Sequence, residues 1–182
     1  MVPALKSIKH ALRPRKNVPH TGATSATTDD GSLGSASTEH PVLEALFRFW
    51  SGKKAALGHL PSRRDISPSE IKKLLPHIAI ADVIDDGEDF RFRVCGTMIS
   101  EGAGVELTGK SWQSFTGTEN IIARSRHLVE TAEPYYITNQ RAHWAPKDFQ
   151  HYTVLALPLA SDGKAVDMVL YGLVYHPMER GE

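Results

Sequence analysis

The chain has 182 residues, of which 41% are hydrophobic and 23% are charged, so it has the composition of a globular protein with one domain-sized core. Basic and acidic residues balance to a formal net charge of zero, which argues against a dedicated nucleic-acid-binding protein. Cys95 is the single cysteine, which excludes an internal disulfide framework. The sequence has no long apolar run and no signal peptide, so we expect a cytoplasmic protein.

The first 38 residues differ from the rest of the chain in composition. They carry five basic residues against two acidic ones, and residues 17–38 are rich in Gly, Ser, Thr and Ala. Such a segment cannot bury enough apolar surface to offset the entropy that ordering removes. We therefore expect residues 1–38 to be a disordered basic arm and linker.

The extreme N terminus has a helical pattern of its own. Apolar residues recur there at spacings of three and four: Val2, Leu5, Ile8 and Leu12. A helix this short is marginal in water, so two interpretations remain open. Residues 1–16 are either a disordered tail or a basic helix that forms on contact with a membrane surface or an acidic partner.

Two helices are expected at the start of the folded part. Residues 39–51 place four apolar side chains on one helical face: Leu43, Leu46, Phe47 and Trp50. Gly52 is positioned to end this helix. Ser67, a following proline and Glu70 form a capping-box pattern, which predicts a second helix that ends before Pro76.

The pattern then changes to that of an antiparallel sheet with intervening helices. Strands are expected at 78–84, 89–95, 135–144, 152–159 and 166–175, and helices at 97–103 and 118–132. Strict alternation places Phe90, Phe92 and Val94 on one face of the second strand. The last strand is apolar on both faces, so it must be covered on both sides. We expect the helices between strands two and three on one side, and the helix at 39–51 is the candidate for the other. The fold class is therefore α+β.

Four segments resemble a small PAS family of single-domain alphaproteobacterial proteins that was formerly a domain of unknown function. These segments are 60–83, 90–99, 106–112 and 155–175. The resemblance extends over residues 42–176. It implies a PAS domain at 39–176 followed by a short tail at 177–182. It also implies a five-stranded sheet of order 2-1-5-4-3 with helices over one face.

The resemblance further implies a non-enzymatic sensory or protein-interaction role in bacterial signalling. Some relatives are cell-cycle modulators of the MopJ kind, and histidine kinases are the expected class of partner. The candidate residues for a homodimer or partner interface are Leu43, Leu46, Phe47, Trp50, Tyr171 and Tyr175. The alternative for the helical face is that it covers the chain's own sheet.

A second interpretation is a small-molecule sensor with a ligand inside the domain. Strand alternation and helix positions indicate apolar pocket candidates: Phe92, Val94, Met98, Ile99, Trp112, Phe115, Ile122, Tyr136 and Leu157. His127 and Asn139 would supply polarity, and haem ligated by His127 is the sharpest form of this hypothesis. The alternative is that these residues fill a solid core.

Motifs for metal binding and catalysis are missing from the sequence. No His or Cys pair has a recognised metal-ligand spacing, and there is no nucleophile elbow or P-loop. Cys95 lies at a strand end, outside the stretch that light-sensing flavin domains use. We therefore expect no metal, no tightly bound cofactor and no enzymatic activity.

Overall fold

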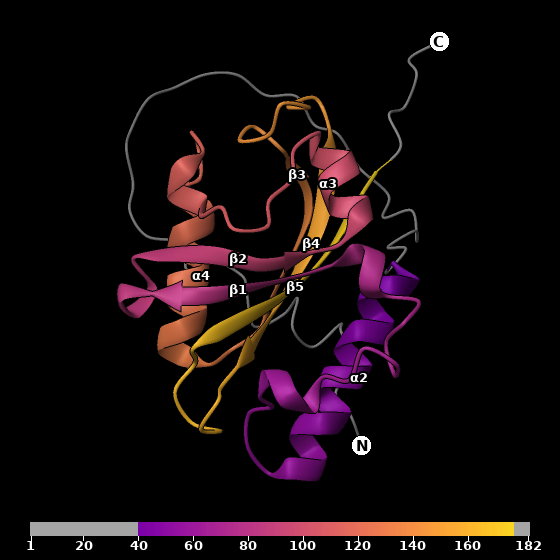
Figure 1. The fold of residues 1–182 in the computed structure, drawn as a ribbon, viewed down its shortest axis with the longest axis vertical. Helices are drawn as coiled ribbons and strands as arrows, with labels where there is room; N and C mark the ends of the chain where they lie inside the picture. The colour runs from indigo at the N-terminus through magenta and orange to yellow at the C-terminus, as the bar shows by residue number, and fades with distance from the viewer. Residues whose placement is uncertain (1–39, 177–182) are drawn as a thin grey trace, which may run out of the picture.

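The computed structural model describes residues 40–176, which fold around one antiparallel five-stranded sheet (Figure 1). The strands are β1 (Ile78–Ile84), β2 (Asp89–Cys95), β3 (Tyr135–Arg141), β4 (His151–Leu159) and β5 (Met168–Tyr175). Their order in the sheet is β2-β1-β5-β4-β3, which confirms the expected α+β architecture and topology. The expectations for residues 1–38 and 177–182, including a membrane contact through residues 1–16, lie outside the described residues. Within the described part, no helix is both long and apolar enough to cross a bilayer.

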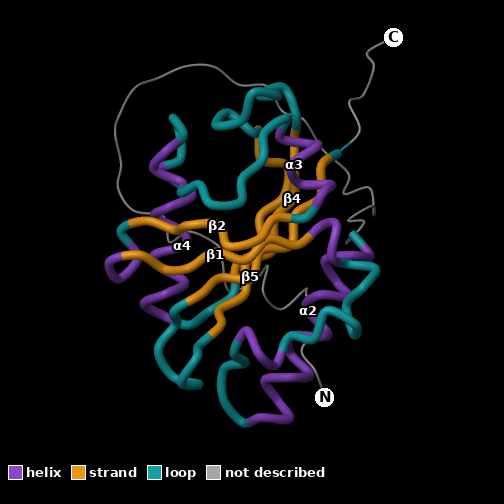
Figure 2. The backbone as a smooth tube through the Cα atoms, viewed as in Figure 1, coloured by secondary structure: helices purple, strands orange, loops and turns teal. Residues whose placement is uncertain are grey.

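Helices lie on both faces of the sheet, as the apolar last strand requires (Figures 1 and 2). Helix α2 (Pro41–Leu57) packs on β4 and β5 and covers what we call the outer face. Helices α3 (Thr97–Ala103) and α4 (Glu119–Thr131) lie over the opposite, inner face. Both faces of the sheet are therefore buried, and the residues on them belong to one hydrophobic core.

Helix α2 packs closely on the outer face. The contact is closest at Gly172 in β5, where a Cβ atom would lie 2.6 Å from a Leu46 methyl group. Trp50 Nε1 donates a hydrogen bond of 2.9 Å to the carbonyl oxygen of Pro158 in β4. The helix passes through Gly52, where we expected it to end, and terminates at Gly58, whose φ of 74° suits a left-handed cap. A glycine inside a helix costs only about 1 kcal/mol, which the burial of the apolar stripe outweighs.

The second expected helix does not form. Residues 68–74 make a series of turns that lead into the short 3-10 helix η2 (Leu75–His77). The Ser67 hydroxyl pairs with a neighbouring serine hydroxyl, and the Glu70 carboxylate binds Lys53 Nζ of α2 at 2.9 Å. Both capping-box side chains thus have other partners, and the segment follows the surface of α2 instead of forming its own helix.

The β1–β2 hairpin contains a bulge that changes which side chains share a face. Ile80 pairs with Val94, but the next residue of β1, Ala81, pairs with Phe92, so β2 has one extra residue at this point. Phe92 therefore points to the inner face and is buried, whereas Val94 is 44% exposed. The simple alternation that placed both on one face is wrong for Val94.

Candidate functional site

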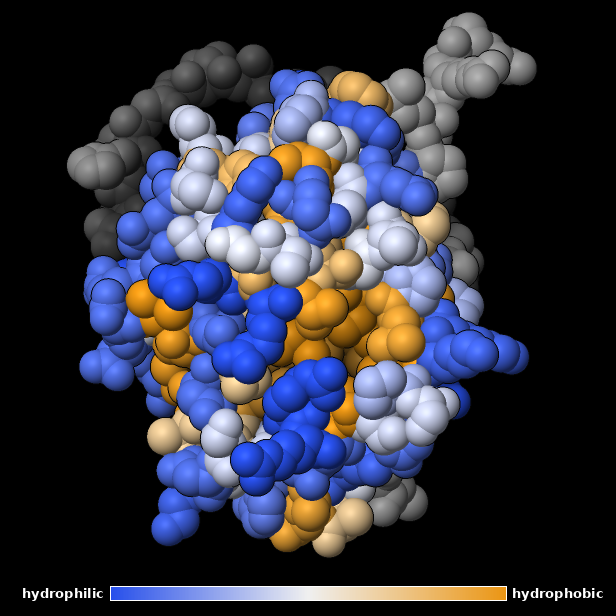
Figure 3. Space-filling model, in the orientation of Figure 1, coloured by the Kyte–Doolittle hydropathy of each residue, from blue (hydrophilic) through white to orange (hydrophobic). Residues whose placement is uncertain are grey.

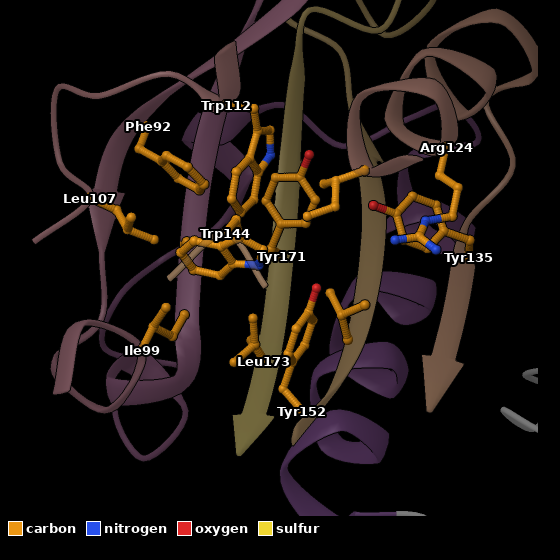
Figure 4. A pocket seen from close by; sticks show the side chains of 13 residues that line it. Phe92, Ile99, Leu107, Trp112, Arg124, Tyr135, Trp144, Tyr152, Tyr171 and Leu173 are labelled. Atoms are coloured by element: carbon orange, nitrogen blue, oxygen red, sulfur yellow. The ribbon is translucent and has the colours of Figure 1, made fainter. Parts of the chain in front are cut away.

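A small cavity lies between the inner face of the sheet and helices α3 and α4 (Figure 4). It is small, with a volume of about 20 Å³ and room for about one water molecule. Its walls are largely aromatic and aliphatic. The residues that line it are Ala79, Phe92, Ile99, Leu107, Trp112, Ile121, Arg124, Tyr135, Trp144, Tyr152, Val154, Tyr171 and Leu173.

Aromatic rings in edge-to-face contact form one wall of the cavity. Trp112 comes from the 3-10 helix η4 (Trp112–Ser114), and Trp144 comes from the segment between β3 and β4. The Trp112 ring lies 4.8 Å from Phe92 and 4.9 Å from Trp144, measured between ring centroids, and both contacts are edge-to-face. This arrangement is favourable for aromatic quadrupoles. It also joins two loop segments to the edge strand β2.

A hydroxyl network connects α4 to the sheet beside the cavity. The buried Ser125 hydroxyl lies 2.8 Å from the Tyr171 hydroxyl of β5 and 3.2 Å from the Tyr135 hydroxyl of β3. Burial raises the pKa of Tyr135 to about 12 and raises the pKa of Tyr171 well above its usual value. Both phenols therefore stay neutral near physiological pH, and their hydrogen-bonding capacity is largely used within the network.

Three buried N–H donors at the cavity have no hydrogen-bond partner among the described residues: Nε1 of Trp112, Nε1 of Trp144 and Nε of Arg124. Each indole is oriented toward a phenol, Trp112 toward Tyr171 and Trp144 toward Tyr152. Burial raises the pKa of each phenol, and the nearby indole N–H offsets part of that rise, but neither pair reaches hydrogen-bond geometry. Buried donors of this kind are rare in folded proteins and call for an explanation.

Arg124 on α4 also brings an unbalanced charge to the cavity. Its Nη1 donates a long hydrogen bond of 3.4 Å to Oε1 of Gln140, and the side chain forms no ion pair within residues 40–176. By contrast, Arg126 on the same helix lies 3.1 Å from a carboxylate oxygen of Glu88. The Arg124 guanidinium lies beside Tyr135 (Figure 4). The cavity therefore holds several N–H donors without a partner and one guanidinium without a counter-ion within residues 40–176.

The structure brings three of the predicted pocket residues to the cavity, namely Phe92, Ile99 and Trp112. Tyr136 and Leu157 are buried too, but Tyr135, Tyr152 and Val154 are the residues of β3 and β4 that line the cavity. Side chains alternate between the two faces along a strand. The prediction placed Tyr136 and Leu157 on the inner face, but residues of the opposite alternation line the cavity, so the prediction was shifted by one residue on both strands.

The other predicted pocket residues lie away from the cavity walls. Val94, Met98, His127 and Asn139 are exposed, while Phe115 and Ile122 are half-buried against the core. Because His127 points away from the cavity lining, the described residues do not fit a haem held by this side chain. Within residues 40–176 no group of three or more His, Cys, Asp or Glu side chains could hold a metal ion.

The predicted interface residues are used inside the domain. Four of them are buried between α2 and the outer face: Leu43, Leu46, Phe47 and Trp50. Tyr171 lines the cavity, and Tyr175 is half-buried on the same strand. In this structure the apolar face of α2 covers the chain's own sheet, which was one of the two alternatives.

Sequence reasoning missed four polar or aromatic residues of the cavity: Arg124, Tyr135, Trp144 and Tyr152. A signal for Arg124 is present in the helical spacing. Ile121 and Leu128 are the buried apolar residues of α4, and a residue three positions after Ile121 shares their face. Trp144 has no comparable signal, because its position depends on the loop between β3 and β4.

The sheet order and the helices over the inner face define a PAS fold. Residues 38–174 match the family described as "PAS domain", and the chain belongs to this family. No curated protein matches the chain in sequence.

Several solved structures are similar. The PAS domain of histidine kinase ThkA is 14% identical, over 53% of this chain and 97% of that one, with a TM-score of 0.39. A sensory box sensor histidine kinase from Vibrio cholerae is 14% identical, over 61% and 90%, with a TM-score of 0.42. A light-oxygen-voltage domain described with a flavin analogue is 16% identical, over 61% and 87%, with a TM-score of 0.44.

Proposed function

We propose that this PAS domain is a non-enzymatic sensory module of bacterial signalling. It senses a small molecule in the cavity of the inner face and reports its presence by docking on a signalling protein such as a histidine kinase, including kinases that control the cell cycle. Membership of the PAS family supports the general sensory role. The structural support comes from the position of α3 between the cavity and an exposed apolar surface.

Helix α3 contributes neighbouring residues to both places, and this observation carries the proposal. Ile99 is 1% exposed and lines the cavity, whereas the preceding residue, Met98, is 46% exposed. Leu75 of η2 and Val94 of β2 are also large exposed apolar side chains, and we call these three residues the α3 patch. Figure 3 shows apolar side chains gathered in the middle of this view of the molecule, surrounded by polar ones. Exposed apolar groups of this kind are typical of protein-contact sites.

Helix α3 packs closely on its neighbours at two glycines. At Gly96, between β2 and α3, a Cβ atom would lie 2.3 Å from the carbonyl oxygen of Pro76 in η2. At Gly102, near the end of α3, a Cβ atom would lie 2.0 Å from the ring of Tyr175 on the inner face of β5. A ligand that displaced Ile99 would therefore shift α3 and the exposed Met98 with it.

The docking half of the proposal is tested with purified full-length protein and the histidine kinases of the bacterium that encodes it. We expect the protein to change the autophosphorylation rate of at least one kinase several-fold. Met98→Asp should abolish this effect, because it places a charge in an apolar contact. Leu57→Asp is the matched control, since Leu57 is exposed at the far end of α2 and should leave the effect intact. Equal responses with both variants, or no responsive kinase, would overturn the assignment.

The sensory half is tested by native mass spectrometry of the same preparation. We expect a mass above that of the polypeptide, which is lost on denaturation, and the same spectrum measures whether the predicted homodimer forms. A bare polypeptide mass, together with the absence of binding to any fraction of a cell metabolite extract, would contradict a sensory role for the cavity.

A further inference from the structure

We propose that the cavity binds a small organic carboxylate, with Arg124, Trp144 and Trp112 as its recognition residues. This inference rests on the proposed sensory function and specifies the chemical class of the ligand. Three kinds of observation support it: the unpartnered donors, the unbalanced charge and the apolar surroundings.

The donors are placed for a ligand with more than one acceptor. Trp112 and Trp144 are each only 5% exposed, and their indole N–H groups are buried at the cavity without a partner in the described part of the chain. The Ser125 hydroxyl already interacts with Tyr171 and Tyr135. The Tyr171 and Tyr152 hydroxyls lie near the two indoles but do not reach hydrogen-bond geometry with them, so an occupant with its own acceptors would satisfy these donors. A carboxylate has two oxygen atoms that accept about four hydrogen bonds and donates none.

The charge on Arg124 selects an anion over a neutral acceptor. Its Nε is buried and unpartnered, and no carboxylate within residues 40–176 forms an ion pair with it. A guanidinium in a partly desolvated position is stabilised by a planar anion that it can contact through two parallel N–H groups. Its half-buried helical neighbour Arg126, in contrast, already has Glu88 as its partner.

The remaining walls select an organic anion over a strongly hydrated inorganic one. Phe92, Leu107 and Leu173 supply apolar surface around the donors. An apolar wall cannot replace the hydration shell of phosphate or sulfate, but it accepts a short hydrocarbon or aromatic group. The cavity volume of about 20 Å³ is room for about one water molecule, so a carboxylate and its tail enter only when surrounding side chains move, among them Ile99 of α3.

The chain is well suited to a direct test, because it contains three tryptophans in distinct environments. In a ¹H–¹⁵N spectrum each indole N–H gives one peak. Trp50 is an internal reference, since its N–H is bonded to Pro158 on the outer face. We expect acetate, isobutyrate and benzoate to shift the Trp112 and Trp144 peaks saturably and to leave the Trp50 peak in place. Sodium chloride at equal ionic strength, acetamide and benzyl alcohol are the ionic and neutral controls.

Two variants on α4 separate recognition from folding. Arg124→Gln keeps hydrogen-bonding capacity but removes the charge, and it should weaken carboxylate binding at least about tenfold. Arg126→Gln, on the same helix, should change binding less than about twofold. An unchanged Trp50 peak in each variant shows that the fold is retained. If Arg124→Gln does not fold, Trp144→Phe serves instead and should weaken binding while leaving the Trp112 peak responsive.

The outcomes also separate this inference from the function on which it rests. Binding of the neutral analogues as tight as that of the carboxylates would overturn the carboxylate assignment but leave a sensory cavity. No shift with any carboxylate up to concentrations that saturate weak sites would overturn it as well. A kinase response that depends on Met98 would stand in either case, because it is measured on the α3 patch.

Discussion

The two faces of the sheet bury tryptophans in opposite ways. On the outer face, Trp50 lies under α2 and its N–H is bonded to Pro158. On the inner face, Trp112 and Trp144 are equally buried, yet their N–H groups have no partner in the described residues. A fold under selection for stability alone would satisfy all three donors. The difference matches our proposal that the outer face holds the domain together, whereas the inner face leaves donors available to a ligand.

The largest expected effect is on the outer face. Leu46 is fully buried against β5, so Leu46→Ala should lower the free energy of unfolding by about 2–5 kcal/mol. Leu107→Ala, which enlarges the cavity of the inner face, should lower it less, because loop segments around the cavity can relax. Guanidinium titrations followed by circular dichroism measure both values. An equal or larger loss at Leu107 would remove the distinction between the faces.

The next comparison exchanges one tryptophan on each face for phenylalanine. Trp50→Phe leaves the Pro158 carbonyl oxygen without its donor and should cost about 1–3 kcal/mol beyond the lost ring contacts. Trp144→Phe removes a donor that has no partner among the described residues. The free energy of unfolding should therefore fall by about 1 kcal/mol less in this variant than in Trp50→Phe. Thermal unfolding in chloride buffer tests the order of the two variants. The reverse order would mean that the Trp144 N–H has a structural partner.

A smaller effect of opposite sign is expected at Arg124. Arg124→Met removes a partly buried charge that has no counter-ion within residues 40–176, so it should stabilise the ligand-free protein by up to about 1 kcal/mol. Arg126→Met breaks an exposed pair with Glu88 and should be neutral or slightly destabilising. Differential scanning calorimetry of both variants decides the sign. A lower melting temperature for Arg124→Met would show that the guanidinium supports the fold.

Much of the fold was predictable, because it depends on local patterns. The five strands and the helices at 97–103 and 118–132 follow from periodicity, and their observed bounds differ from the expected ones by a few residues. The second N-terminal helix was not predictable from its capping pattern. Glu70 forms an ion pair with Lys53, seventeen positions away in the chain, and that competition is a tertiary effect.

The cavity was less predictable, because it depends on register. The bulge at Ile80 and Ala81 moves Val94 to the exposed side, and a shift of one residue on β3 exchanges Tyr136 for Tyr135. Hydrophobic alternation can be read from the sequence, but neither the bulge nor the register shift has a sequence signal that is as clear. Trp144 is brought in by a loop, whose course no periodicity describes.

The smallest expected effect concerns acid and the outer face, at the N terminus of α2. His40 caps this helix, and its Nδ1 accepts a 3.4 Å hydrogen bond from the backbone N–H of Val42, which requires the neutral ring. Burial, and then the nearby charges of His77 and His176, lower the pKa of His40 below its usual 6.5. In acid the unfolded chain therefore takes up this proton before the folded protein does, so stability should fall as the pH drops below about 6.5 and level off once the folded protein is protonated too.

His40→Asn isolates that contribution, because asparagine also caps helices well but does not titrate. The free energy of unfolding of the two proteins should be closest near about pH 7.5, and the wild type should lose more than the variant on acidification to about pH 5. Parallel pH profiles would assign the acid sensitivity to other groups. The inner face should contribute nothing in this range, because burial keeps the Tyr135 and Tyr171 hydroxyls protonated far into alkaline solution. Acid would then weaken the packing of α2 on the outer face and leave the hydroxyl network at the cavity intact. The two faces would therefore differ in how their stability depends on pH.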